Sequence, residues 1–181
     1  MASVRAFVAC EIGNEARARI AATIEVLRPR LAGVRFVAPE AIHVTLRFLG
    51  WSQPEALDAI APLLRVAAAR CPASDAGIGG LGLFPERGAP RILWLGLELA
   101  PPVLELQRAC EAAAVAAGYE AEGRGFRSHL TLGRWRERAA RPVLEPVEIG
   151  ATRLAKLVLF RSELRRRGAV YTPLVEFPLA T

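Results

Sequence analysis

The two histidines of this 181-residue chain open the same four-residue phrase. The first phrase reads HVTL over residues 43–46, and the second reads HLTL over residues 129–132. Because the unperturbed pKa of histidine lies closest to neutral pH, His43 and His129 together can supply one general base and one general acid. A single histidine more often has a structural role, but a repeated pair in a chain with only six threonines favours joint use of both rings.

The first phrase fits a β-strand, which we expect over residues 42–49. Alternate residues of a strand point to the same side, so His43, Thr45 and Arg47 share one face. The intervening apolar residues, Phe48 among them, then pack into the core. This parity predicts that Arg47 joins the histidine and the threonine in a site.

The second phrase fits a strand over residues 126–134. His129 and Thr131 share a face of it, and Arg127 has the same parity. Arg134 has the opposite parity, but a bulge at the preceding glycine would redirect its side chain. We therefore expect Arg134 to contact substrate, with Arg127 as the weaker candidate.

An imidazole and a hydroxyl on each of two arms suit chemistry at phosphorus. One histidine would take a proton from the nucleophile, and the other would give a proton to the leaving oxygen on the opposite side. The threonine hydroxyls would donate to non-bridging oxygens, and nearby arginines would stabilise the negative charge. From the residues alone, the two histidines are interchangeable in these roles.

The composition sets limits on location and partners. The net charge is +6, and 23 of the 24 cationic residues are arginine, whose planar fork matches phosphate oxygens and stacks on bases. An RNA or nucleotide substrate would explain this bias, and so would an arginine-rich proteome, so the charge alone does not identify the substrate.

The three cysteines are far apart and odd in number, which favours a reduced, cytoplasmic location. No apolar run is long enough to cross a bilayer, and the first ten residues read as a strand and not a signal peptide.

Apolar spacing predicts alternating strands and helices. The first helix should have Asn14 as its N-cap and end near Arg28, the second should begin at a capping box over residues 52–55, and the third should run from Pro101 to a C-cap at Gly118. Strands are expected over residues 5–12, 34–37, 42–49, 78–84, 91–99, 126–134, 154–160 and 170–177, with a loop over 136–146.

The two halves share an order of strand, helix, motif strand and further strand, which suggests an internal duplication. We predict an α+β fold in which residues 1–181 form one domain of two pseudo-symmetric lobes. Two antiparallel sheets with outer helices would flank a central cleft that holds both motifs.

Other signals in the chain point elsewhere and are weaker. Residues 77–82 match GxGxxG, but a continuing strand comes next where the dinucleotide fingerprint needs a helix. Two histidines without an acidic cluster supply too few ligands for a catalytic zinc, so no metal is expected. The basic run formed by Arg161 and residues 165–167 fits a solvated turn better than an RNA contact, although both stay open. Trp135 could stack on a base.

The chain resembles the 2H phosphoesterase superfamily, named for its two His-x-Thr motifs, and within it the LigT-like RNA 2′,3′-cyclic phosphodiesterases. The resemblance runs nearly the whole length. It includes residues 5–9, 42–50, 82–85, 91–94, 126–134, 162–168, Tyr171 and 177–179. Small departures are Ser128, where many members have proline, and Phe36, where tryptophan is common. The first could loosen the second motif strand, and the second could alter base stacking.

The resemblance implies a bilobal fold and hydrolysis of ribonucleoside 2′,3′-cyclic phosphates to 2′-phosphates without a metal or other cofactor. It implies that His43 is the proton donor and His129 the proton acceptor. The expected partners are RNA ends or nucleotides with a 2′,3′-cyclic phosphate and no membrane, and we expect a monomer. Two alternatives remain: a 2′,5′-RNA ligase or phosphodiesterase of the same superfamily, and a basic RNA-binding module without turnover.

Overall fold

The computed structural model describes residues 3–165 and 168–181. The helices of this part are α1 (Asn14–Leu27), α2 (Pro54–Arg70) and α3 (Pro101–Ala116), with a short 3-10 turn over Pro39–Ala41. The strands are β1 (Val4–Glu11), β2 (Val34–Phe36), β3 (His43–Ser52), β4 (Ser74–Phe84), β5 (Ile92–Leu99), β6 (His129–Trp135), β7 (Glu148–Leu154), β8 (Lys156–Arg165) and β9 (Gly168–Pro178).

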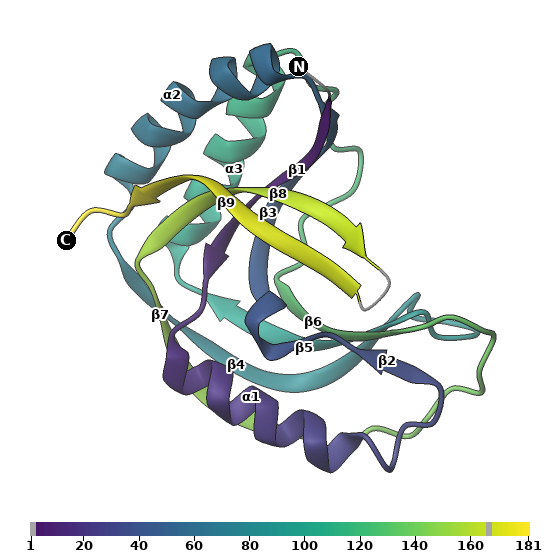
Figure 1. The fold of residues 1–181 in the computed structure, drawn as a ribbon. Helices are drawn as coiled ribbons and strands as arrows, with labels where there is room; N and C mark the ends of the chain where they lie inside the picture. Colours follow the sequence, from purple (N-terminus) through teal and green to yellow (C-terminus); the bar gives the residue numbers. More distant parts are fainter. Residues whose placement is uncertain (1–2, 166–167) are drawn as a thin grey trace.

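The strands form two antiparallel sheets, as the sequence predicted. One has the order β3-β1-β8-β9, and the other has the order β2-β6-β5-β4-β7. Helix α3 packs against β3, α2 packs against β8 and β9, and α1 packs against β7. The helices therefore lie on the outer sides, with α2 and α3 together at one end and α1 at the other (Figure 1). The predicted α+β class with outer helices is confirmed.

Each sheet combines strands from both halves of the chain. In the four-stranded sheet, β1 pairs with β3 on one side and with β8 on the other. In the five-stranded sheet, β2 pairs with β6. The C-terminal hairpin of β8 and β9 thus completes the sheet that the N-terminal strand begins, as the yellow and purple ribbons show (Figure 1).

Two helix starts differ from the sequence-based expectation. Asn14 is the first helical residue, so the N-cap is Gly13, whose backbone N–H donates to the Thr152 hydroxyl at 2.8 Å. The predicted capping box at 52–55 is also wrong, because Ser52 ends β3 and its hydroxyl donates back to the Gly50 carbonyl. Helix α2 instead starts with Pro54 in its first turn, where the missing N–H costs nothing.

The core fills the space between the sheets and their helices. Helices α1 and α2 bury apolar residues at helical spacing, which are Ile20, Ile24 and Leu27 in α1 and Leu57, Ile60, Leu64 and Ala67 in α2. Val103, Leu106 and Cys110 of α3 are buried as well. A separate small cluster of Phe7, Ala9, Val158 and Phe160 lies on the opposite face of the four-stranded sheet. That sheet is therefore apolar on both faces, and its second face is available to line a site.

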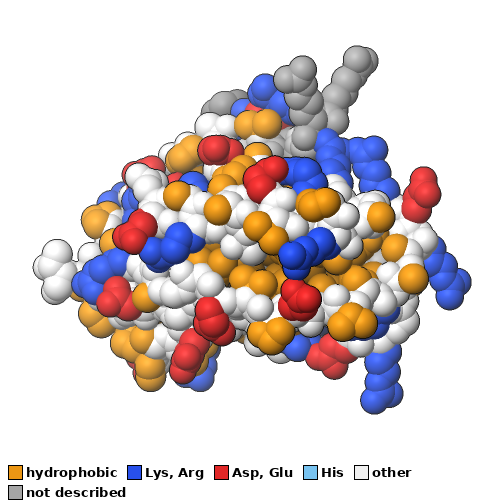
Figure 2. Space-filling model, turned by 90° about the horizontal axis from the view of Figure 1, so that it is seen from below, with side chains coloured by type: hydrophobic (Ala, Val, Ile, Leu, Met, Phe, Trp, Pro, Cys, Tyr) orange, Lys and Arg blue, Asp and Glu red, His pale blue; other side chains and the backbone are white. Residues whose placement is uncertain are grey.

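The surface carries both charge signs. Figure 2 shows basic and acidic side chains interspersed among apolar ones on the face seen from below, without one uniformly basic field. Of the basic run predicted near the C-terminus, Arg161 and Arg165 both bond Glu163, while residues 166 and 167 lie outside the described part. Within residues 3–165 and 168–181, no helix is long and apolar enough to span a membrane.

Candidate active site

A cleft of about 1090 Å³ lies between the two sheets. Both motif strands open onto it, β3 from the four-stranded sheet and β6 from the five-stranded sheet. All six side chains singled out from the sequence line this one cleft: His43, Thr45, Arg47, His129, Thr131 and Arg134. The structure therefore brings together residues that are far apart in the chain.

The two motif strands have the same burial pattern, residue by residue, over 43–49 and 129–135. In each, the pairing with the neighbouring strand shifts register at the leucine of the motif, Leu46 in β3 and Leu132 in β6. Each leucine is an extra residue that reverses the parity of the residues after it. The two motif strands therefore share one local geometry.

Both imidazole rings are held in the same way. Nδ1 of His43 lies 2.8 Å from the Ala41 carbonyl oxygen, and Nδ1 of His129 lies 2.7 Å from the Arg127 carbonyl oxygen. A carbonyl only accepts, so each neutral ring carries its proton on Nδ1. Nε2 of each ring is left with a lone pair for the cleft, where it can bind or accept a proton.

Aromatic rings surround both histidines. His43 stacks on Phe7 with ring centroids 4.7 Å apart, and Tyr171 meets it edge-on at 5.0 Å. His129 meets the edge of Phe84 at 5.2 Å. Such apolar walls favour the neutral imidazole over the imidazolium ion.

The pKa values of the two histidines follow from this packing. Burial lowers the pKa of His43 to about 4, against the opposing effect of the Ala41 carbonyl. Burial also lowers the pKa of His129, and the nearby positive charges of Arg134 and Arg127 act in the same direction. In the empty cleft at neutral pH, both rings are therefore neutral.

Thr45 and Thr131 lie two residues beyond the histidines and are half-buried on the cleft wall. Their backbones pair with Ala9 and Trp94, so neither main chain can shift freely. Neither hydroxyl has a hydrogen-bond partner among the described residues. Both are therefore available to donate to a ligand oxygen.

Arg47 lines the cleft but is occupied by protein groups. Its side chain is only 8% exposed, and Nε lies 2.5 Å from Oε2 of Glu111 on α3. Nη1 donates to the Phe48 carbonyl at 2.5 Å, and Nη2 donates to the Glu120 carbonyl. The guanidinium group therefore ties β3 to α3 and to the segment before β6.

The bulge in β3 corrects two predictions. Phe48 was expected in the core, but it is 53% exposed and lines the cleft. The reason is the extra residue at Leu46, which turns Phe48 to the cleft face. The same shift turns Arg47 to the face of Val8 and toward Glu111, so the prediction that Arg47 shares a face with His43 and Thr45 is wrong, although its side chain still borders the cleft.

The equivalent bulge in β6 lies at Leu132, one residue before the glycine at which it was expected. It places Arg134 on the cleft wall despite its sequence parity. Gly133 beside it permits close approach of β2, since a Cβ there would lie 2.5 Å from Val34 Cγ1. The same shift buries Trp135, whose indole N–H donates to the Ala32 carbonyl at 3.2 Å. The suggestion that Trp135 stacks on a base is therefore wrong.

Arg127 also borders the cleft. It forms an ion pair with Glu86, and its guanidinium group lies 4.9 Å above the Phe84 ring.

The two departures from the family pattern, Ser128 and Phe36, both have contacts in the structure. The hydroxyl of Ser128 donates to the Leu97 carbonyl at 2.7 Å and so fixes the start of β6. Phe36 is half-buried beneath the guanidinium of Arg28.

Sequence reasoning missed several residues of the cleft wall. Phe7 and Tyr171 contact His43. Burial raises the pKa of the Tyr171 hydroxyl, and the positive charges of Arg134 and Arg5 partly oppose that rise. The spacing of Arg5 and Phe7 could have predicted that both side chains lie on the cleft wall, because alternate residues of a strand share a face. This pattern was not recognised because the opposite face of β1 is apolar as well.

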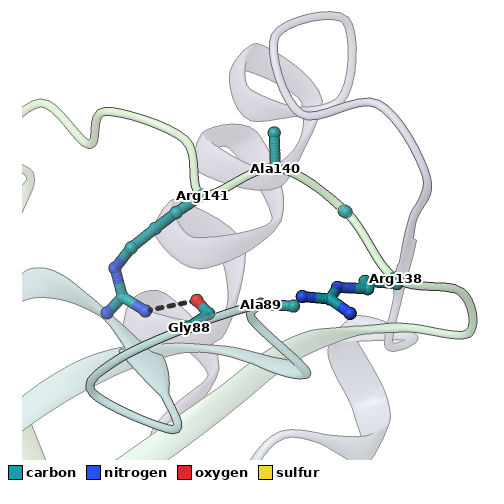
Figure 3. Close-up of a pocket in the computed structure, with 6 residues that line it drawn as sticks. Gly88, Ala89, Arg138, Ala140 and Arg141 are labelled. Carbon is teal, nitrogen blue, oxygen red and sulfur yellow. Dashed lines mark hydrogen bonds between the residues drawn. The ribbon is translucent and has the colours of Figure 1, made fainter.

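A second pocket of about 560 Å³ lies beside the turn that comes after β4. Arg138 and Arg141 border it, and Arg141 donates to the Gly88 carbonyl (Figure 3). Arg141 also donates to the Pro85 carbonyl. None of the six predicted site residues lines this pocket. The two hydrogen bonds of Arg141 tie the 136–146 loop to the turn that borders the main cleft.

The described residues contain neither a candidate metal site nor an exposed thiol. Residues 3–165 and 168–181 contain no group of three or more His, Cys, Asp or Glu that could hold a metal ion. Cys10, Cys71 and Cys110 are all buried and unpaired. Burial raises the pKa of each thiol, to about 12 for Cys110.

Fold and site together define an α+β protein with one His-x-Thr strand on each wall of a single cleft. The chain belongs to the 2′-5′ RNA ligase superfamily, whose family model matches residues 16–164. The resemblance to LigT-like 2H phosphoesterases is confirmed.

Relatives named RNA 2′,3′-cyclic phosphodiesterase match over nearly the full length. One from Methanothermobacter thermautotrophicus is 33% identical over 97% of this chain and 99% of its own. One from Thermus thermophilus is 34% identical over 97% and 90%. A solved structure of a Thermus thermophilus protein matches with a TM-score of 0.86 at 31% identity, over 97% of both chains. Escherichia coli LigT complexed with 3′-AMP shares the fold, with a TM-score of 0.85 at 24% identity over 99% of both chains.

Proposed function

We propose that this chain is an RNA 2′,3′-cyclic phosphodiesterase, a phosphoric diester hydrolase that forms 2′-phosphomonoesters. The observation that carries the proposal is the matched pair of histidines on opposite walls of one cleft, each fixed through Nδ1 with Nε2 left for a substrate. The name shared by full-length relatives supports the same reaction. We propose that the reaction needs no metal or cofactor, because two imidazoles can move both protons.

The proposed mechanism is an in-line displacement at the cyclic phosphorus. His129 takes a proton from water through Nε2 as the water oxygen bonds to phosphorus. The bond from phosphorus to the 3′-oxygen breaks, and His43 gives that oxygen a proton from Nε2. The products are a 2′-phosphate and a free 3′-hydroxyl. The direction of this assignment comes from the family resemblance, since the two arms have the same geometry.

His43 can act as the acid only if the substrate changes its protonation. With the pKa of His43 lowered to about 4, the ring is neutral in the empty cleft. A phosphodiester anion next to the ring favours the imidazolium ion and raises that pKa. The negative charge of the proposed substrate thus promotes protonation of His43, the general acid that acts on it.

The remaining residues bind and position the phosphoryl group. We propose that the hydroxyls of Thr45 and Thr131 donate to its non-bridging oxygens, one from each wall. Arg134 would stabilise the negative charge that builds up on these oxygens. Arg47 was also expected to bind substrate. Its guanidinium group pairs with Glu111 and donates to two backbone carbonyls, so we propose that it mainly positions the cleft wall.

We further propose that the protein acts as a cytoplasmic monomer on RNA ends that carry a 2′,3′-cyclic phosphate. Because both sheets draw strands from both halves of the chain, we propose that residues 1–181 act as one domain. The family includes 2′-5′ RNA ligases by name. Ligation is the second candidate function, in which a ribose hydroxyl takes the place of water.

The test is turnover of an oligoribonucleotide with a 2′,3′-cyclic phosphate end in excess chelator, with the position of the product phosphate identified. A 2′-phosphate product that is lost in both His43→Ala and His129→Ala supports the proposal. Val66→Ala, at an exposed position on α2, is the matched control and should keep full activity. Turnover only of 2′,5′-linked RNA would favour the second candidate. RNA binding without turnover, steeply salt-dependent and unaffected by loss of either histidine, would favour a binding module.

A further inference from the structure

One tryptophan stands outside the catalytic constellation and is unusually exposed. Trp51 lies on β3, an edge strand, and its side chain is 75% exposed. An indole ring in such an open position offers a large flat surface on which another ring can stack. Within the described residues, no aromatic ring or cationic group contacts the Trp51 ring, so most of its surface is available to a ligand.

Strand register shows which face of the sheet Trp51 occupies. Trp51 lies directly opposite Arg5, Arg5 lies opposite Ser162, and Ser162 lies opposite Tyr171. Directly opposite residues point to the same face of a sheet, with Cβ atoms about 5 Å apart. Arg5, Ser162 and Tyr171 all line the catalytic cleft, so Trp51 continues the cleft face beyond its edge.

The position along β3 sets what can reach this tryptophan. Trp51 and Thr45 pair with Arg5 and Ala9, which are four residues apart on β1, so they are separated by about 13 Å along the sheet. Phe48 lies between them and lines the cleft. A nucleotide whose phosphate sits between the two histidines cannot extend its own base that far. The next nucleotides of an RNA strand can.

The chemistry of the row fits single-stranded RNA. An indole face stacks any base, and an adjacent arginine binds the phosphate between bases. Arg5 makes no ion pair or hydrogen bond within the described part of the chain, so its guanidinium group is available for such a phosphate. An aromatic surface next to a cation, continuous with a phosphoester cleft, is the arrangement that single-stranded nucleic acid requires.

We propose that Trp51, together with Arg5, forms a subsite for an upstream nucleotide of the RNA whose cyclic phosphate end occupies the cleft. The proposal rests on the proposed function and makes it more specific. It assigns the enzyme a preference for oligoribonucleotide ends over free nucleoside 2′,3′-cyclic phosphates.

The test compares adenosine 2′,3′-cyclic phosphate with a tetranucleotide that ends in the same group. In the native chain, the tetranucleotide should have the lower KM. Trp51→Leu should raise the KM of the tetranucleotide about tenfold, in line with the loss of one base stack, and leave that of the mononucleotide unchanged. Trp51→Phe keeps a stacking ring and should retain most of the difference. Val66→Ala, which also trims an exposed apolar side chain, should change neither value.

A binding measurement separates this inference from the proposed function. Trp51 is the most exposed of the three tryptophans, since Trp94 is half-buried and Trp135 is buried. A tetranucleotide with a terminal 2′-phosphate should quench indole fluorescence in the native chain and much less in Trp51→Leu. This readout needs no turnover, so it holds or fails independently of catalysis.

Three results would overturn the subsite. They are equal KM values for the two substrates in the native chain, a Trp51→Leu effect on both substrates alike, and quenching that survives in Trp51→Leu. A dimer that Trp51→Leu converts to a monomer in sedimentation would instead assign Trp51 to contact with a second copy. If neither substrate turns over but quenching is lost in Trp51→Leu, the subsite stands and the proposed reaction fails.

Discussion

The protonation of His43 should depend almost entirely on whether an anion occupies the cleft. Burial against Phe7 and Tyr171 lowers the pKa of His43 to about 4. At pH 7, about one molecule in a thousand then carries the His43 imidazolium ion in the free protein. An acid so rarely charged could not serve catalysis unless the substrate changed its pKa.

The change in pKa that catalysis requires is within reach of one bound anion. Half-protonation at pH 7 needs the pKa of His43 to rise by about 3 units, or about 4 kcal/mol. One negative charge about 4 Å from the ring supplies about 4 kcal/mol at an effective dielectric constant near 20. A single phosphoryl oxygen in hydrogen-bonding range of Nε2 is thus sufficient. We expect the pKa of His43 to rise from about 4 to about 7 when adenosine 2′-phosphate, the proposed product, binds.

The chain is well suited to the measurement because it contains only two histidines. Histidine-labelled protein should give two sets of ring signals in an NMR titration, and His129→Gln should assign them. Without ligand, the His43 ring should still be neutral at pH 6; with saturating adenosine 2′-phosphate, it should be largely protonated. If His43 titrates at pH 6.5 or above in the free protein, the burial argument is refuted. If the ligand leaves its pKa unchanged, the proposed effect of the substrate on the acid is refuted.

Further predictions concern stability and reactivity. Because folding lowers the pKa of His43, the unfolded chain takes up the proton first, so the stability that depends on His43 should be present in full above pH 6.5 and fall as the pH drops toward 4. In urea unfolding, the loss between pH 7 and pH 5 should be about 2 kcal/mol smaller in His43→Gln, and the loss that remains there includes the contribution of His129, whose pKa burial also lowers. Thr152→Val, which removes the acceptor for the Gly13 N–H, should cost about 1 kcal/mol in urea unfolding, and a value near zero would show that this cap does not matter. Gly133→Ala should cost about 1–3 kcal/mol because its Cβ would meet Val34, whereas Gly123→Ala, with open space around it, should be neutral; equal midpoints would contradict the close approach of β2. The three cysteines should react slowly with a thiol reagent at pH 8 until the protein unfolds, and one fast thiol would contradict their burial.

The motif strands could be predicted well because both local and chemical patterns agreed. Alternation placed His43 and Thr45 on one face, and the second phrase repeated the same order around His129. Helical spacing found the buried faces of α1 and α2, since those helices contact the sheets along one stripe. Expecting the two motifs in one cleft required only the duplication of elements along the chain.

The parts that could not be predicted depend on single extra residues and on distant partners. Parity arguments assume a regular strand, so the bulge at Leu46 inverted the expectation for Phe48. Strand β7 was missed because Gly150 interrupts its alternation at a register shift with β4. The stacking of Phe7 on His43 is set by the pairing of β1 with β3, which no local pattern reveals.

The exchange of strands between the two halves affects how the protein can be made. Strand β1, synthesised among the first, lacks its partner β8 until residue 165 has left the ribosome, and β2 must wait for β6. The wall that holds His43 therefore completes its hydrogen bonding only after β8 has been made, and such distant pairings slow folding. A growing chain would keep its cleft unformed until β8 is available, so a product truncated before β8 would carry His43 without an intact wall to support it.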